Sequence, residues 1–183
     1  MNLLQAYSLL NMITEDADNY LEEYKKYIIN HKANVSKFAD WLLKKCPEVF
    51  KDIDIMSFKT LINNHDESKF SKEEFEPYAR FWFNDSEHYD YDPEYEAAWE
   101  HHWKNNKHHP EFWQGQDMPL IYILEMLCDW GSFSISKNDM NELFDCYYEE
   151  AQDDDEKNLS ENTKILIEKI LGQISAALEG EGT

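Results

Sequence analysis

The sequence predicts an all-α protein, a helical bundle of about seven or eight helices in a single domain that spans residues 1–183. Apolar residues recur at helical spacing along most of the chain. Only five glycines and five prolines are present, too few for the turns of a many-stranded β protein. A chain of 183 residues with 42% hydrophobic residues is long and apolar enough to bury one core.

Helical periodicity indicates where these helices lie, and residues that start or stop helices mark several of their ends. The expected helices are residues 2–13, about 16–45, about 55–64, 71–83, 93–103, 119–133, 138–150 and 160–178. An acidic linker, residues 149–156, is expected before the last of them. The helices that hold the candidate site cover about residues 16–135.

In the first half of the chain, Pro47 ends the second expected helix because proline cannot continue one. Ser71, followed three residues later by Glu74, is a capping-box pattern that opens the fourth helix. Asp92 before Pro93 supplies an N-cap and an N1 proline for the fifth.

In the second half, Pro119 can open the sixth expected helix and Asn138 can cap the seventh. The last helix is expected to begin at Ser160 and to bury an apolar face rich in isoleucine. Every expected helix therefore has an apolar face, a start signal or both.

The charge balance restricts the class of partner. There are 38 Asp and Glu residues against 17 Lys and Arg, a formal net charge of -21. Such a surface disfavours long nucleic acids, whose phosphates are bound mainly by Lys and Arg. It permits a small nucleotide held through a metal ion, which reverses the local field.

Cysteine content and hydropathy indicate the expected cellular location. The three cysteines form no CxxC pair, and no apolar run reaches the roughly 18–20 residues of a membrane span. We therefore expect a cytoplasmic protein without a membrane partner. The sequence leaves its oligomeric state open.

The histidines are grouped. His65 is followed by Asp66, and two pairs, residues 101–102 and 108–109, lie within nine residues of each other. Imidazole together with carboxylate suits Mn²⁺, Fe²⁺, Co²⁺, Ni²⁺ or Zn²⁺. The grouping therefore predicts a divalent-metal site organised around His65-Asp66.

Three further polar residues interrupt apolar helix faces: His31, His102 and Asp129. A carboxylate in an apolar helix is costly unless it is paired or bound to metal. Each residue also has a simpler explanation. His31 could be a hydrogen-bonded core histidine, Asp129 could pair with a lysine, and the histidine pairs could lie on the surface. Together with His65-Asp66, they favour one inward-facing site.

In order and spacing, these residues resemble the HD superfamily of metal-dependent phosphohydrolases. The matching positions are His31, then His65-Asp66, then the histidine pairs, then Asp129, and the segment HDESKF is similar to the HD-x-x-K form of the motif, with Lys69 as its basic residue. A closer similarity is to small HD-like proteins of bacteria and phages. It is carried by the stretches NHDESKFSKEEFEPYARFWF, AAWEHHWKNNKHH and MPLIYILEMLCDW.

The resemblance implies an HD-like fold and one divalent ion (Mn, Fe, Co, Ni, Zn or Mg), and it allows a second ion. The implied ligands are His31, His65, Asp66, Asp129, His102 and either His108 or His109, with His109 chosen. The implied catalytic residues are Asp66, Lys69, which would neutralise charge on a phosphate, and Glu67, which would handle protons. The implied substrate contacts are Lys69, His101 and His108. Helical phase favours His102 over His101 as the inward member of its pair.

The resulting hypothesis is a metal-dependent phosphohydrolase that acts on a small nucleotide or another phosphoester. Two alternatives belong to other classes. One is a non-catalytic, acidic, metal-binding interaction protein, for example a nucleic-acid mimic or a phage accessory protein. The other is an HD-like di-iron oxygenase.

Overall fold

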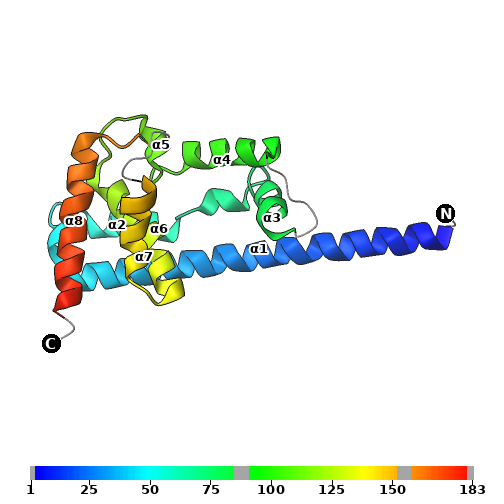
Figure 1. Cartoon of the computed structure of the whole chain (residues 1–183), viewed down its shortest axis with the longest axis horizontal. Helices are drawn as coiled ribbons and strands as arrows, with labels where there is room; N and C mark the ends of the chain where they lie inside the picture. Colours follow the sequence, from blue (N-terminus) through cyan, green and yellow to red (C-terminus); the bar gives the residue numbers. More distant parts are fainter. Residues whose placement is uncertain (1–2, 85–90, 152–157, 181–183) are drawn as a thin grey trace. The chain divides into compact units, whose positions relative to one another are not determined.

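The computed structural model describes residues 3–84, 91–151 and 158–180, and every regular element in these ranges is helical (Figure 1). The predicted all-α class is confirmed. The α-helices of the described residues are α1 (Leu3–Lys45), α2 (Ile55–Asn63), α3 (Phe75–Phe83), α4 (Pro93–Asn105), α5 (Pro110–Trp113), α6 (Leu120–Lys137), α7 (Asn141–Asp145) and α8 (Glu161–Glu179). Two 3-10 turns, η1 (Pro47–Phe50) and η2 (Glu67–Phe70), and a π-helical turn, η3 (Cys146–Ala151), complete the set.

The helices form two compact units. The first consists of residues up to Asn30 together with Glu67–His102, and the second consists of His31–Asp66 together with the residues from Trp103 onward. The expectation of a single domain stays a prediction. His31, His65, Asp66 and Asp129 all belong to the second unit, whereas His101 and His102 belong to the first.

Each unit has its own apolar core. The buried core of the first unit is drawn from α1, α3 and α4, and consists of Tyr24, Ile28, Tyr78, Ala79 and Ala98. In the second unit α6 packs against α2, α7 and α8, and half of its residues are buried, including Leu124, Leu127 and Cys128 (Figure 1). The second unit thus has an interior helix, and that helix carries Asp129.

The N-terminal helices differ from the prediction. The two helices expected over residues 2–13 and 16–45 are one continuous helix, α1. No glycine or proline occurs before Pro47, so nothing in the backbone interrupts the helix between these stretches.

The predicted capping box at Ser71 and Glu74 does not form. Helix α3 begins at Phe75, and the Glu74 carboxylate accepts hydrogen bonds from Ser68 Oγ, at 3.0 Å, and from His101 and His102. Because these partners occupy the carboxylate, it does not return to the Ser71 backbone as a capping box requires.

The helix starts farther along the chain agree better with the sequence. The Asp92 side chain accepts from the backbone N–H of Glu94 at 2.8 Å, so the predicted N-cap is confirmed. The side chain of Ser160, where the last helix is expected to begin, accepts from the backbone N–H of Thr163 at 3.1 Å and caps α8. Asn138 instead ends α6 in the left-handed conformation, with φ of 53°, which asparagine tolerates well. Of the acidic linker expected at 149–156, residues 149–151 belong to the π-helical turn η3, and residues 152–156 lie outside the described residues.

No helix in the described ranges combines the length and the apolar composition that a membrane span requires.

Gly131 allows α1 and α6 to pack closely. A Cβ atom on this residue would lie 2.4 Å from Cγ of the buried Phe38 ring. Gly172, in the interior of α8, has nothing within 4 Å of the equivalent position. Both glycines lie in helix interiors, but only Gly131 is closely packed. Replacing each with alanine therefore separates the effect of close packing from that of helix propensity.

We predict that Gly131→Ala destabilises the protein by about 1–3 kcal/mol, because the added methyl group displaces the Phe38 ring. The matched control, Gly172→Ala, should be stabilising by about 0.5–1 kcal/mol, since alanine is favoured in an open helix interior. Urea denaturation of both variants measures these effects. Equal stabilities for the two variants would contradict the close packing of α1 on α6.

Candidate metal centre

Three segments of the second unit bring four potential metal ligands together. His31 comes from α1, His65 and Asp66 from the turn after α2, and Asp129 from α6. One ligand atom from each of these residues lies within 4.8 Å of those of all the others. His31 Nε2 is 3.0 Å from Asp129 Oδ1 and 3.5 Å from Asp66 Oδ2.

His65 completes this group. Its Nε2 atom lies 3.3 Å from His31 Nε2, 3.5 Å from Asp66 Oδ2 and 3.4 Å from Asp129 Oδ1. With metal–ligand bonds of about 2.1 Å, neighbouring ligand atoms of a tetrahedral or octahedral ion lie about 3.0–3.4 Å apart. The spacing of these atoms therefore fits the first coordination shell of one divalent ion.

The backbone at Asp66 makes the convergence feasible. Adjacent residues of a continuous helix point about 100° apart and cannot readily ligate the same small ion. Here α2 ends at Asn63, and Asp66 adopts the left-handed conformation with φ of 55°. Aspartate is one of the few residues other than glycine that enters this region at modest cost. The turn directs both His65 and Asp66 toward the same point.

The far sides of the two imidazoles are also held. His65 Nδ1 lies 3.2 Å from Glu125 Oε1, and His31 Nδ1 lies 3.2 Å from Ser132 Oγ. An ionised carboxylate can only accept, so His65 donates from Nδ1, and Nε2 is the nitrogen that an ion could bind in place of a proton. Ligating histidines commonly have such an orienting partner on the second nitrogen.

Electrostatics favours a cation at the centre. Burial alone would lower the pKa of His65, but Asp66, Asp129 and Glu125 outweigh it and raise that pKa to about 10. Burial would raise the pKa of Asp129, yet hydrogen bonds from His31 and His65 hold it well below its usual value. The carboxylates are thus ionised and need positive charge, which a divalent ion could supply in place of a proton.

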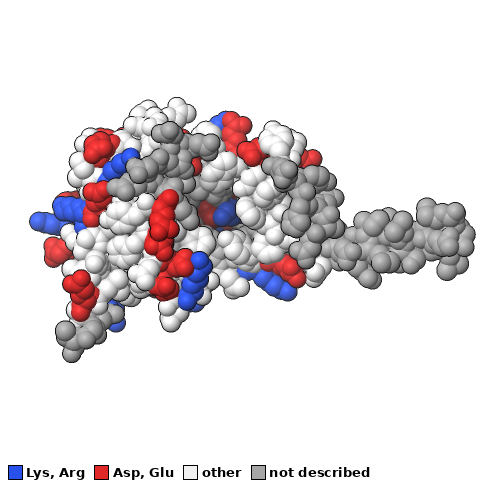
Figure 2. All heavy atoms as spheres, viewed as in Figure 1, with Lys and Arg blue, Asp and Glu red and all other residues white. Residues whose placement is uncertain are grey.

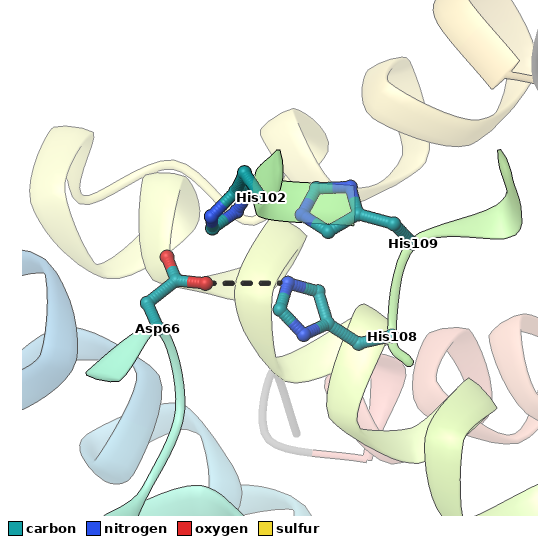
Figure 3. Close-up of side chains that lie close together, drawn as sticks. All are labelled: Asp66, His102, His108 and His109. Atoms are coloured by element: carbon teal, nitrogen blue, oxygen red, sulfur yellow. Dashed lines mark ion pairs between the residues drawn. The ribbon is translucent and has the colours of Figure 1, made fainter. Parts of the chain in front are cut away.

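A further histidine faces the other oxygens of the two aspartates. His108 Nε2 lies 3.5 Å from Asp66 Oδ1 (Figure 3) and 3.9 Å from Asp129 Oδ2, and its Nδ1 lies 3.4 Å from Glu125 Oε1. Ligand atoms of Asp66, His108 and His109 lie within 4.8 Å of one another. His102, also labelled in Figure 3, belongs to the first unit and is described with that unit.

A family model matches residues 21–173 of the chain. The chain belongs to DUF5662, a family of unknown function. The matched range includes every candidate ligand from His31 to Asp129. No curated protein and no solved structure matches the chain.

The first unit contains a second cluster of imidazoles. Glu74, fully buried, accepts from His101 Nδ1 at 2.7 Å and from His102 Nδ1 at 2.8 Å. His102 also packs against Trp99 and Tyr78 and is buried, so its predicted inward orientation is confirmed. Its role as a ligand and that of His101 in substrate binding stay predictions.

The remaining predicted residues are placed as follows. Glu67, exposed, and Lys69, half-buried, lie in η2 of the first unit. His109 precedes α5 in the second unit, and its Nδ1 lies 3.8 Å from Glu111 Oε2. The catalytic roles of Glu67 and Lys69 and the choice of His109 as a ligand stay predictions.

The sequence reasoning missed Glu125 and the role of Glu74. A signal was available for Glu125, which lies four residues before Asp129 in the same apolar helix and is subject to the same burial cost. Glu74 fits a capping box equally well, so nothing local distinguishes its actual role.

We predict that a saturating divalent ion raises the melting temperature of the wild-type protein by about 5–10 °C, because an ion at 100 times its dissociation constant contributes about 2.7 kcal/mol. His65→Ala should lose this shift, whereas Glu22→Gln, at an exposed carboxylate of the first unit, should keep it. Thermal melting with Mn²⁺, Co²⁺, Ni²⁺ and Zn²⁺, together with elemental analysis, measures both. A protein that binds none of these ions has no metal centre of this kind.

Proposed function

We propose that the protein is a metal-dependent phosphohydrolase of the HD type that acts on a small nucleotide or another phosphoester. The observation that carries the proposal is the convergence of four buried or half-buried ligand atoms from three chain segments at separations of 3.0–3.5 Å. Their order along the chain, His31, His65-Asp66 and Asp129, agrees with the HD pattern.

His31, His65, Asp66 and Asp129 would hold the first ion. Two imidazoles favour Mn²⁺, Fe²⁺, Co²⁺, Ni²⁺ or Zn²⁺ over Mg²⁺. The side chains of His65 and Asp66 are at most 1% exposed, whereas that of Asp129 is 16% exposed, so solvent reaches the group from the Asp129 side. When bound, a divalent cation supplies Lewis-acid activation of water and of a phosphoryl oxygen.

A second ion would use the outward oxygens of the same aspartates. His108 Nε2 faces Asp66 Oδ1 and Asp129 Oδ2, so both aspartates could bridge two positions. These separations, 3.5 and 3.9 Å, are wider than those around His65. We therefore assign the first position the higher affinity. His109 is the proposed additional ligand on this side.

The charge distribution supports a small substrate. The chain carries a net charge of -21, and Figure 2 shows acidic side chains in several groups across the face that it draws. Long nucleic acids would meet repulsion over such a surface. A small phosphoester exposes less charge to this surface. Lys69 and His101 belong to the first unit, and their roles in substrate binding stay predictions.

The proposed location is the cytoplasm. Cys46, Cys128 and Cys146 are all free thiols, as expected in a reducing compartment.

We predict that the wild-type protein with Mn²⁺, Co²⁺ or Ni²⁺ hydrolyses a generic phosphoester or a member of a nucleotide panel. Asp66→Asn should lower the rate by at least about 100-fold. The variant removes a charged metal ligand, and loss of a residue that only orients a ligand already costs about 10–100-fold. Asparagine tolerates the left-handed backbone of this position, so the fold should persist. The outcome is read by product release, with circular dichroism as the control for folding.

Other results of that assay would favour other functions. Tight metal binding with an intact nucleotide panel would contradict the hydrolase and favour a non-catalytic metal protein. Oxygen consumption by the iron-loaded protein would favour an oxygenase.

We also predict that the wild-type protein binds two divalent ions per chain at saturation and that His108→Ala binds one, since His108 is a proposed ligand of the second position and not of the first. Elemental analysis after equilibrium dialysis gives the stoichiometry. One ion per chain in the saturated wild type would contradict the second position and leave the first intact.

A further inference from the structure

Glu125 is a buried carboxylate that lies beside two candidate ligands at once. It is 3% exposed and belongs to α6, one turn before Asp129. A single oxygen, Oε1, lies 3.2 Å from His65 Nδ1 and 3.4 Å from His108 Nδ1. A buried carboxylate is costly unless polar partners compensate it; His65 provides a hydrogen bond and His108 an ion-pair contact.

The geometry around Glu125 determines which nitrogen of each ring carries the proton. The carboxylate can only accept hydrogen bonds, so it favours a proton on the Nδ1 atom that faces it in each ring. Nε2 is then the nitrogen of each ring that an ion could bind in place of a proton, and each Nε2 lies 3.5 Å from a different oxygen of Asp66, His65 from Oδ2 and His108 from Oδ1. Both rings are thus held between two carboxylates, with Glu125 on one side and Asp66 on the other.

The other imidazole of the first position is held differently. His31 Nδ1 contacts Ser132 Oγ, which serves this ring alone and can either donate or accept. Glu125 contacts the Nδ1 atom of one ring of each position, whereas Asp66 and Asp129 contact the same two rings at Nε2. The centroids of the two rings are 4.4 Å apart, so movement of the Glu125 carboxylate would disturb both.

We propose that Glu125 is a positioning residue that sets the tautomers of His65 and His108 and thereby couples the two metal positions. This inference rests on the metal centre of the proposed function. It does not depend on the identity of the substrate, because Glu125 acts through the imidazoles.

The test uses the full chain, Zn²⁺ alone as the probe and Glu125→Gln as the variant. Glutamine has the same shape but no charge, so Zn²⁺ affinity measured by calorimetry should fall by about 10–100-fold, the usual effect of losing an orienting carboxylate. The matched control is Glu168→Gln, in the same unit, where the carboxylate accepts from Tyr147 Oη at 3.3 Å. This control should bind Zn²⁺ as the wild type does.

The second readout is the protonation state of the two rings. Nitrogen-15 NMR of the zinc-loaded wild type should show His65 and His108 protonated at Nδ1 and not at Nε2, and Glu125→Gln should move both sets of signals. The inference is overturned if either ring is unprotonated at Nδ1, or if a folded Glu125→Gln keeps wild-type affinity. A wild type that binds no Zn²⁺ overturns the metal centre itself, whereas normal wild-type binding with an unaffected variant overturns only the role of Glu125.

Discussion

Ionised carboxylates buried among imidazoles are the constraint on which the second unit depends. Asp66 and Glu125 are both almost fully buried, and Asp129 lies beside them with only part of its side chain in contact with solvent. Such charges are stable in an apolar interior only when they are paired and hydrogen-bonded. His31 and His65 supply that pairing. Helices α1 and α6 and the turn after α2 are placed so that these two imidazoles contact the carboxylates.

Helix α6 carries both the packing and the chemistry of this unit. Glu125, Asp129 and Ser132 follow one another at helical spacing and therefore share a face, which contacts the imidazoles. Gly131, off this stripe, admits the Phe38 ring of α1. Close packing of α1 on α6 is thus linked to the position of His31, which lies two turns before Phe38 on α1.

The two units share one local arrangement of a glutamate and two histidines. In each, the Nδ1 atoms of two histidines face one buried glutamate: Glu125, with His65 and His108, in the second unit, and Glu74, with His101 and His102, in the first. In this arrangement the glutamate holds Nδ1 of each ring, so Nε2 can contact another partner. In a family of unknown function, this arrangement is a more specific pointer to metal chemistry than the number of histidines alone.

The sequence by itself determined the helical class, most helix starts and the candidate ligands His31, His65, Asp66 and Asp129, because periodicity, caps and the cost of buried charge are local properties. Only the tertiary structure decided that these ligand atoms converge, since they come from segments separated by up to about a hundred residues. It also decided the role of Glu125, because a carboxylate on an apolar face can cap, pair or orient. Which of these occurs depends on the groups that other helices bring against it.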